Sequence, residues 1–159
     1  MKNASTATTR SMRSARGYDP ARHLLQPGQV VASPETRLEY RIEGWLGEGG
    51  FGQVFLARRL GRSARVAETV CIKASTRIDG WLREAYFGQL LDQHPRAIRV
   101  YDAFPLPRPE NEILYCLALE YARHGDLRAY LHRAGRGWPE RVVRREIAIA
   151  SGRPGGTAS

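Results

Sequence analysis

Three glycines and one lysine are the residues of this sequence whose types and spacing could hold a phosphate group. Gly47, Gly49 and Gly52 stand close together, and Lys73 follows twenty-one positions after the last of them. A glycine has no Cβ, so its backbone can adopt the dihedral angles of a tight turn and approach a ligand closely. Free backbone N–H groups in such a turn point at anionic oxygens. The pattern therefore predicts a phosphate-binding turn with a cation nearby.

The residues around the glycines decide which kind of nucleotide turn this is. In a dinucleotide-binding fold the turn opens a helix, and an acidic residue follows about twenty positions later. Here residues 52–57 are rich in strand-forming types and predict a strand instead. The Gly-Lys-Ser/Thr sequence of a P-loop does not follow the glycines either. What remains is a glycine hairpin between two antiparallel strands, with Lys73 on a third.

The residues around Lys73 predict a strand that presents the lysine beside a small apolar side chain. Cys71 and Lys73 are two positions apart, so they project to the same face of a strand. Val70 and Ile72 project to the other face. If Lys73 reaches phosphates, its neighbour on that face must be small and apolar enough to lie over the base, and Cys71 is suitable.

Taken together, these motifs resemble those of the protein kinase family. The glycine pattern G-x-G-x-x-G-x-V matches residues 47–54, and the strand motif V-A-I-K matches residues 70–73. Taken singly, each piece would be an ordinary hairpin or a surface lysine. The resemblance implies ATP as the ligand, with Lys73 on its phosphates and Cys71 over its adenine. It also implies contacts from the whole turn: Leu46, Gly47, Glu48, Gly49, Gly50, Phe51, Gly52, Gln53 and Val54.

A helix is predicted over residues 79–91, with Asp79 as a possible N-cap. Glu84 lies on the same helical stripe as Trp81, and a carboxylate that faces a sheet is costly unless a cation meets it. Kinases pair their strand lysine with a glutamate of this helix, so the resemblance implies a catalytic pair of Lys73 and Glu84. The alternative is an exposed helix glutamate. The spacing between the two residues is shorter than the family commonly has.

Alternating or continuous apolar residues predict the remaining strands of an α+β fold. Residues 38–46 lead into the glycine turn, residues 98–104 end at Pro105, and residues 113–119 read as a strand buried on both sides. The resemblance implies a kinase small lobe with a five-stranded antiparallel sheet and one packed helix. The expected organisation is a disordered basic tail (1–37), the small lobe (38–119), the hinge and the beginning of a large lobe (120–150), and an unstructured tail (151–159).

The segment after the last strand is similar to the hinge with which kinases hold adenine. The resemblance implies that Leu119 borders the deep pocket and that Glu120 and Ala122 contribute main-chain groups. It also implies that the Asp126 carboxylate binds the ribose hydroxyls. Asp126 could equally cap the helix that follows, and the two roles are compatible.

The H-R-D-x-x-x-x-N and D-F-G motifs of kinases are missing from this sequence. The resemblance therefore implies Mg²⁺ as a cofactor without its protein ligands, and we expect this chain alone to be inactive. A helix beginning at Pro139 would be the first part of the large lobe, and breakers follow from Ser151. A shifted reading frame or premature stop is one interpretation. A non-catalytic nucleotide-binding or protein-interaction module is the other. The intact family phosphorylates protein hydroxyls, and a bacterial serine/threonine type is expected.

Composition adds expectations about partners and compartment. The net charge is +9, but the arginines are scattered through every segment, so a solvated surface is favoured over nucleic-acid binding. Cys71 and Cys116 form no C-x-x-C motif, which favours buried thiols in a reducing cytoplasm. No apolar stretch is long enough to span a membrane. Residues 1–17 are basic and lack acids, as in a transit peptide, but they have no apolar helical face.

Overall fold

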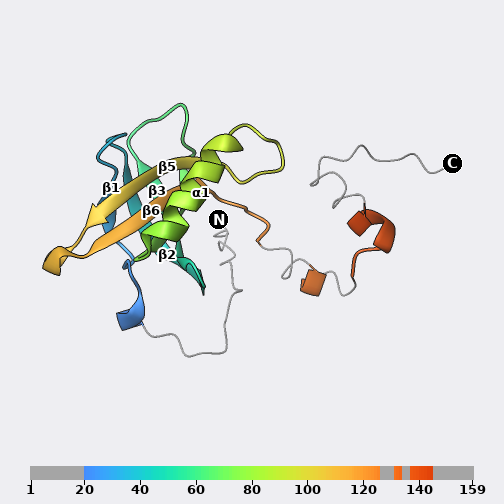
Figure 1. Cartoon of the computed structure of the whole chain (residues 1–159), viewed down its shortest axis with the longest axis horizontal. Helices are drawn as coiled ribbons and strands as arrows, with labels where there is room; N and C mark the ends of the chain where they lie inside the picture. Colours follow the sequence, from blue (N-terminus) through green and yellow to red (C-terminus); the bar gives the residue numbers. More distant parts are fainter. Residues whose placement is uncertain (1–19, 126–130, 134–136, 145–159) are drawn as a thin grey trace, which may run out of the picture. The chain divides into compact units, whose positions relative to one another are not determined.

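The computed structural model describes residues 20–125, 131–133 and 137–144. The chain divides into two compact units, residues 1–121 and 122–159. The elements of the first unit are a 3₁₀ turn (Pro20–Arg22), β1 (Val30–Ala32), β2 (Glu39–Gly49), β3 (Gly52–Leu60), β4 (Thr69–Ser75), α1 (Ile78–Leu90), β5 (Val100–Pro107), a second 3₁₀ turn (Pro109–Asn111) and β6 (Ile113–Glu120) (Figure 1).

The described strands form one antiparallel sheet in the order β1-β2-β3-β4-β6-β5. Side chains alternate between its two faces, as the period of two requires. One face carries a fully buried core that includes Ile42, Phe55, Ile72 and Ala118. The other face carries Lys73, and α1 packs on it against β5 and β6 (Figure 1). The sheet thus separates a dry core from the face that bears the candidate site.

The sheet is curled so that β2 meets β5, although the two strands are not neighbours in the sheet. The Tyr40 ring stacks on Phe104 with 6.1 Å between ring centroids. The Tyr40 hydroxyl donates to Asp102 Oδ2 at 3.3 Å, and the Thr36 hydroxyl donates to the same oxygen at 2.6 Å. Burial, and then the neighbouring Asp102 carboxylate, raises the pKa of Tyr40, so the hydroxyl keeps the proton that it donates.

The sheet has six strands, so the prediction of five is wrong. The additional strand, β1, lies in residues 1–37, which were expected to be a disordered tail. It pairs with β2, and the backbone of Ile42 both donates to Gln29 and accepts from Gly28 at 2.8 Å. Leu25 and Val31 of this segment are fully buried in the core. Local composition, rich in Pro and Gly, concealed a strand that long-range packing stabilises.

Two expected boundaries also differ. The strand expected to end at Pro105 continues to Pro107. This is possible because β5 is an edge strand, where a missing N–H need not break a ladder. The helix begins at Ile78, so its N-cap is Arg77 and Asp79 lies in the first turn. The chain reverses early because the Ser75 hydroxyl accepts from the Arg77 N–H at 3.0 Å.

The last strand was expected to be buried on both sides along its length. Only its middle is, where Cys116, Leu117 and Ala118 are buried in succession, while Ile113 is 43% exposed. The α1 helix contacts β6 at Tyr115 and Cys116 through Trp81, whereas Ile113 stands at the start of the strand and pairs with Pro107 at the end of the edge strand β5.

In the second unit, residues 140–144 are helical. The N–H groups of Val142 and Val143 both donate to the Pro139 carbonyl, which places a helix start where the sequence indicated one. Residues 1–19, 126–130, 134–136 and 145–159 lie outside the described residues. They include part of the expected N-terminal tail and all of the expected C-terminal tail.

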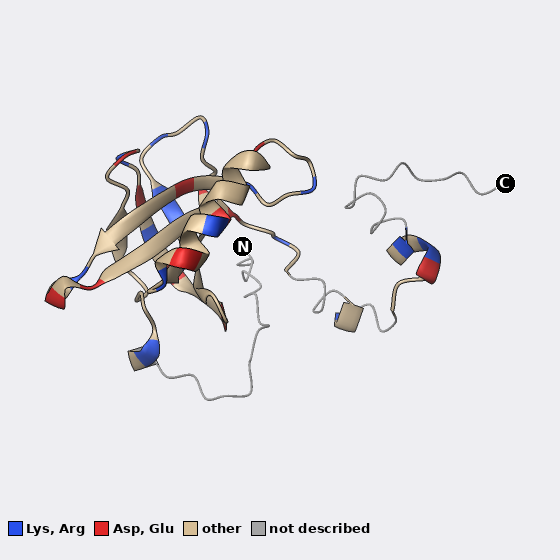
Figure 2. Cartoon of the chain, in the orientation of Figure 1, with Lys and Arg blue, Asp and Glu red and all other residues tan. Residues whose placement is uncertain are grey.

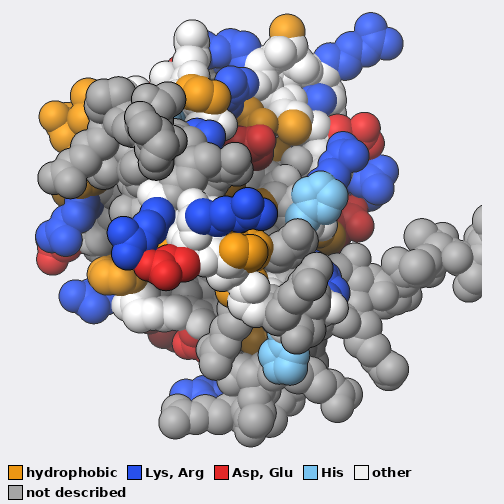
Figure 3. Space-filling view, turned by 90° about the vertical axis from the view of Figure 1, so that its right-hand side faces the viewer, with side chains coloured by type: hydrophobic (Ala, Val, Ile, Leu, Met, Phe, Trp, Pro, Cys, Tyr) orange, Lys and Arg blue, Asp and Glu red, His pale blue; other side chains and the backbone are white. Residues whose placement is uncertain are grey.

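Basic side chains of the described residues stand among acidic ones. The Arg58 guanidinium lies 3.5 Å from carboxylate oxygens of both Glu43 and Glu68. Arg99 lies 3.8 Å from Asp92. Figure 2 shows both signs of charge along the sheet and on α1. On the face drawn in Figure 3, Lys and Arg stand among acidic, hydrophobic and uncharged side chains. This mixture favours a solvated charged surface.

The contact between Tyr40 and Asp102 predicts a stability effect. Asp102→Ala leaves the fully buried Tyr40 hydroxyl without its acceptor, so the free energy of unfolding should fall by about 1–3 kcal/mol, measured by urea denaturation. Combining Asp102→Ala with Tyr40→Phe should cost less than the sum of the two single changes. Simple additivity would show that the hydroxyl and the carboxylate do not stabilise each other.

Candidate nucleotide site

The glycine turn is a tight hairpin between β2 and β3. Glu48 pairs with Gln53 and Gly49 with Gly52, so only residues 50 and 51 form the turn. Gly52 has a φ of +129°, and a Cβ placed there would lie 2.4 Å from the Ala74 carbonyl oxygen. Glycine is therefore required at position 52, because β3 must pass close to β4 as it leaves the turn.

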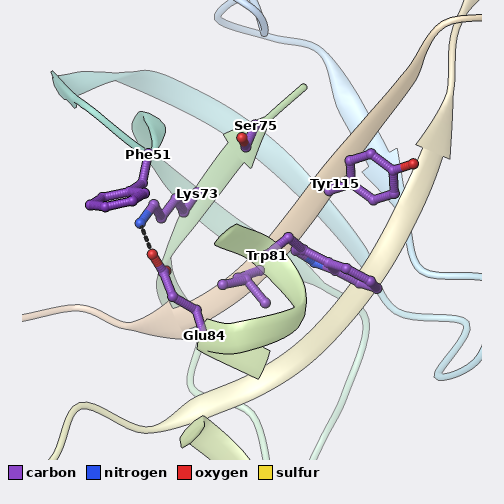
Figure 4. Close-up of a pocket in the computed structure, with 7 residues that line it drawn as sticks. Phe51, Lys73, Ser75, Trp81, Glu84 and Tyr115 are labelled. Atoms are coloured by element: carbon purple, nitrogen blue, oxygen red, sulfur yellow. Dashed lines mark hydrogen bonds and ion pairs between the residues drawn. The ribbon is translucent and has the colours of Figure 1, made fainter. Parts of the chain in front are cut away.

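Lys73 extends from β4 toward this turn and toward α1 (Figure 4). Its Nζ forms an ion pair and a hydrogen bond with Glu84 Oε1. The lysine side chain is 19% exposed and the glutamate side chain 34% exposed, so solvent screens the pair only in part. The same Nζ lies 5.7 Å from the centroid of the Phe51 ring at the tip of the turn. The structure thus brings together the turn, the lysine and the helix glutamate.

Two contacts fix the position of α1 on the sheet, so that Glu84 can reach Lys73. The Trp81 indole N–H donates to the Cys116 carbonyl on β6 at 2.9 Å, and its ring lies 5.3 Å from that of Tyr115. Near the end of the helix, a Cβ placed on Gly88 would be 2.1 Å from Val100 Cγ2. The two contacts lie one turn to either side of Glu84. No sequence motif identifies a partner for either residue, although a glycine inside a predicted helix is a signal of close packing.

A shallow pocket adjoins the ion pair. Its lining comprises Phe51, Lys73, Ser75, Trp81, Glu84, Tyr115 and Leu117 (Figure 4). Its space, including the part open to solvent, is about 170 Å³. Its enclosed part measures about 10 Å³, which is roughly the room that one water molecule needs. A nucleotide would therefore lie on the open face of the sheet beside this pocket and not inside it.

An apolar strip runs across the sheet beside Lys73. Cys71 is paired with Leu56 on β3 and with Leu119 on β6, so the three side chains share the face that carries Lys73. Leu56 and Leu119 are partly exposed, and Cys71 is 9% exposed. Burial raises the pKa of the Cys71 thiol to about 11, so it is neutral and apolar near pH 7. Leu56 was not among the predicted site residues, although the alternation of β3 places it on the same face as Val54.

Of the other residues expected to bind the cofactor, Leu46, Gly47 and Val54 are partly exposed along the hairpin, and Glu48 is exposed. The Gln53 side chain is different, because it points to the opposite face of the sheet and is 6% exposed.

At the end of β6, the Glu120 N–H donates to the Arg99 carbonyl at 2.9 Å, and its carboxylate accepts from the Arg99 N–H at 3.2 Å. Ala122 belongs to the second unit, so the residues expected to form the hinge do not all lie in the first unit. Asp126 lies outside the described residues.

The described residues contain no ready-made cluster of metal ligands. Among them, no three His, Cys, Asp or Glu side chains gather closely enough to hold a metal. The Glu84 carboxylate is already paired with Lys73. In the part of the chain that the structure covers, no helix has the length and apolar character to cross a membrane.

The packing of α1 predicts the effect of a single methyl group. Gly88→Ala places a Cβ against Val100, so α1 must move off β5, and the free energy of unfolding should fall by about 1–3 kcal/mol in a thermal melt. Val100→Ala in the same chain makes room and should restore most of the loss. If Gly88→Ala alone were stabilising, as helix propensity by itself would dictate, the close contact would be refuted.

The comparison with protein-family models gives a match. The family model for protein tyrosine and serine/threonine kinase matches residues 40–153, more than half of the chain. No curated protein matches the chain significantly. The matched region contains the glycine hairpin, Lys73 and Glu84, in the spatial arrangement described above. The chain therefore belongs to the protein tyrosine and serine/threonine kinase family.

Proposed function

We propose that the sheet and α1 bind ATP, with the phosphates between the glycine turn and Lys73. One observation carries this proposal: the Lys73 Nζ is held by Glu84 and lies 5.7 Å from the ring of Phe51, at the tip of the turn. A lysine ammonium has three N–H donors. Glu84 accepts from one of them, and the others can donate to phosphate oxygens.

The adenine ring lies on the apolar strip of Leu56, Cys71 and Leu119 in this proposal. Flat apolar contact without a charged neighbour suits a purine ring, and the neutral thiol of Cys71 presents no charge to desolvate. The strip is next to Lys73 on β4, so one nucleotide can reach both. The main-chain groups of Glu120, at the end of β6, would meet the edge of the base in this proposal.

The affinity can be bounded. Drug-sized ligands gain at best about 0.3 kcal/mol per heavy atom, so ATP, with about 31 such atoms, could reach roughly 9 kcal/mol in a complete site. The described residues of the first unit supply one side of the site and no cluster of metal ligands. We therefore expect binding that is weaker by about half in free energy, which corresponds to a Kd of roughly 1 mM.

In the family, the bound phosphate is transferred to a protein hydroxyl, and we propose the serine/threonine type for this chain. Such transfer needs a bound nucleotide, neutralisation of the developing charge and a base near the acceptor. In this proposal the described residues bind the nucleotide, and they supply neither the charge neutralisation nor the base. Because the sequence contains neither H-R-D nor D-F-G, we expect the 159-residue chain by itself not to transfer phosphate.

A non-catalytic interaction module is the second candidate. The observation in its favour is the outward face of α1, which exposes large apolar side chains including Leu82, Tyr86, Phe87 and Leu90. Large exposed apolar patches are common at protein interfaces. The candidates separate in an ATP titration of the purified chain, because a pure interaction module binds no ATP. Phosphate incorporation above background in a radiolabelled ATP assay would contradict the expectation that this chain alone is inactive.

Calorimetric titration tests the assigned role of Lys73. Lys73→Ala removes the cation and leaves the Glu84 charge unpaired near the phosphates, so the Kd for ATP should rise at least tenfold from about 1 mM, or about 1.4 kcal/mol. Arg65→Ala is the control, because it removes one positive charge from the connection between β3 and β4, at the end of these strands far from the glycine turn. Equal binding by parent and Lys73→Ala would remove the proposed role of Lys73.

The adenine position can be tested by filling it. Cys71→Phe projects a ring onto the face where adenine should lie, and we expect it to abolish measurable ATP binding while the thermal melt remains cooperative. Cys71→Ala keeps that space open and should bind ATP within about threefold of the parent. Undiminished binding by the Phe variant would place the base elsewhere.

A further inference from the structure

Gln53 is in the glycine hairpin, but its side chain is engaged on the face away from Lys73. Val54 is paired with Lys73, so Gln53 points to the other side of β3. There its amide oxygen accepts from the Leu24 N–H at 2.8 Å, and its amide nitrogen donates to the Arg22 carbonyl at 3.1 Å. Both the oxygen and the nitrogen of this nearly buried amide are therefore hydrogen-bonded to the segment that precedes β1.

The residue between these two backbone contacts touches both strands of the hairpin. The His23 ring stacks on Trp45 of β2, with 5.3 Å between centroids and 12° between planes. It also meets the edge of Phe55 on β3 at 6.2 Å. Trp45 and Phe55 are directly opposite each other on the two strands of the hairpin, so the imidazole ring of His23 contacts both members of one cross-strand pair.

The segment is itself anchored, which allows it to restrain the hairpin. The Leu25 side chain is fully buried in the core. The Gly28 N–H donates to the Ile42 carbonyl at 2.8 Å, just before β1 joins the sheet. These residues precede position 40, where the match to the kinase family begins. The support is therefore a feature of this chain outside the matched region.

We propose that residues 22–25, here called the brace, act through Gln53 and His23 to position the glycine hairpin over the nucleotide site. The hairpin needs such support because its ladder has register shifts at Ile42/Gly44 and Trp45/Gly47. Two-stranded hairpins are only marginally stable alone. A tip that is already ordered loses less conformational freedom when phosphates bind. Gln53 is then a positioning residue, which acts from the opposite face and does not touch the ligand.

Hydrogen exchange of the full chain without nucleotide tests the brace directly. Gln53→Met keeps the length of the side chain and removes both hydrogen bonds, and His23→Ala removes the ring contacts. Each should speed amide exchange at residues 48–52 about tenfold. Val66→Ala is the control, since it removes a buried side chain from the connection between β3 and β4 and should leave exchange at 48–52 unchanged. Unchanged exchange at residues 48–52 in both Gln53→Met and His23→Ala overturns the proposal.

ATP titration is the second readout, and this part alone depends on the proposed function. Both variants should raise the Kd for ATP about three- to tenfold. If Gln53→Met weakens binding while His23→Ala does not, Gln53 contacts the nucleotide and the positioning role is overturned. If ATP does not bind to the parent chain, the proposed function fails, and the exchange experiment still decides whether the brace orders the hairpin.

Discussion

The ion pair between Lys73 and Glu84 is the contact on which the arrangement of the first unit depends. Both charges are partly withdrawn from water, and such a pair persists only when its geometry offsets the cost of desolvation. The sheet fixes the lysine by its register, and the glutamate is placed by a helix whose own residues are mostly exposed. The Trp81 indole and the absent side chain at Gly88 hold that helix close enough for the pair to form.

Alternation along the strands divides two tasks between the faces of one sheet. On β3, Phe55 and Ala57 enter the core, while Leu56 faces the proposed nucleotide position. The core face is closed because the sheet curls until β2 meets β5, where the Tyr40 hydroxyl donates a hydrogen bond to Asp102. Each face depends on the other, since a register slip of one residue would bury Lys73 and expose the core.

Much of this site could be predicted because its signals are local. Glycine spacing indicated the hairpin, the period of two placed Cys71 beside Lys73, and the helical stripe pointed Glu84 toward a cation. The structure places Lys73 and Glu84 in contact despite the short spacing between them.

What could not be predicted depends on contacts between residues far apart in the sequence. β1 is three residues long and lies among turn-forming residues, so nothing local distinguishes it from a tail. The direction of Gln53 follows from the register of β3 against β4, which a motif does not contain. Likewise, Gly88 is informative only once Val100 is known to lie opposite it.

The most direct measurement is a titration of the ¹⁵N-labelled chain with a non-hydrolysable ATP analogue, followed by NMR. If phosphates lie between the glycine turn and Lys73, the amide signals of residues 47–54 and 71–73 should shift together and reach half of their maximal shift near 1 mM analogue, as the roughly 4 kcal/mol of binding free energy requires. Shifts confined to the arginine-bearing connection at residues 61–68 would show that ATP meets only surface charge, and would contradict the account.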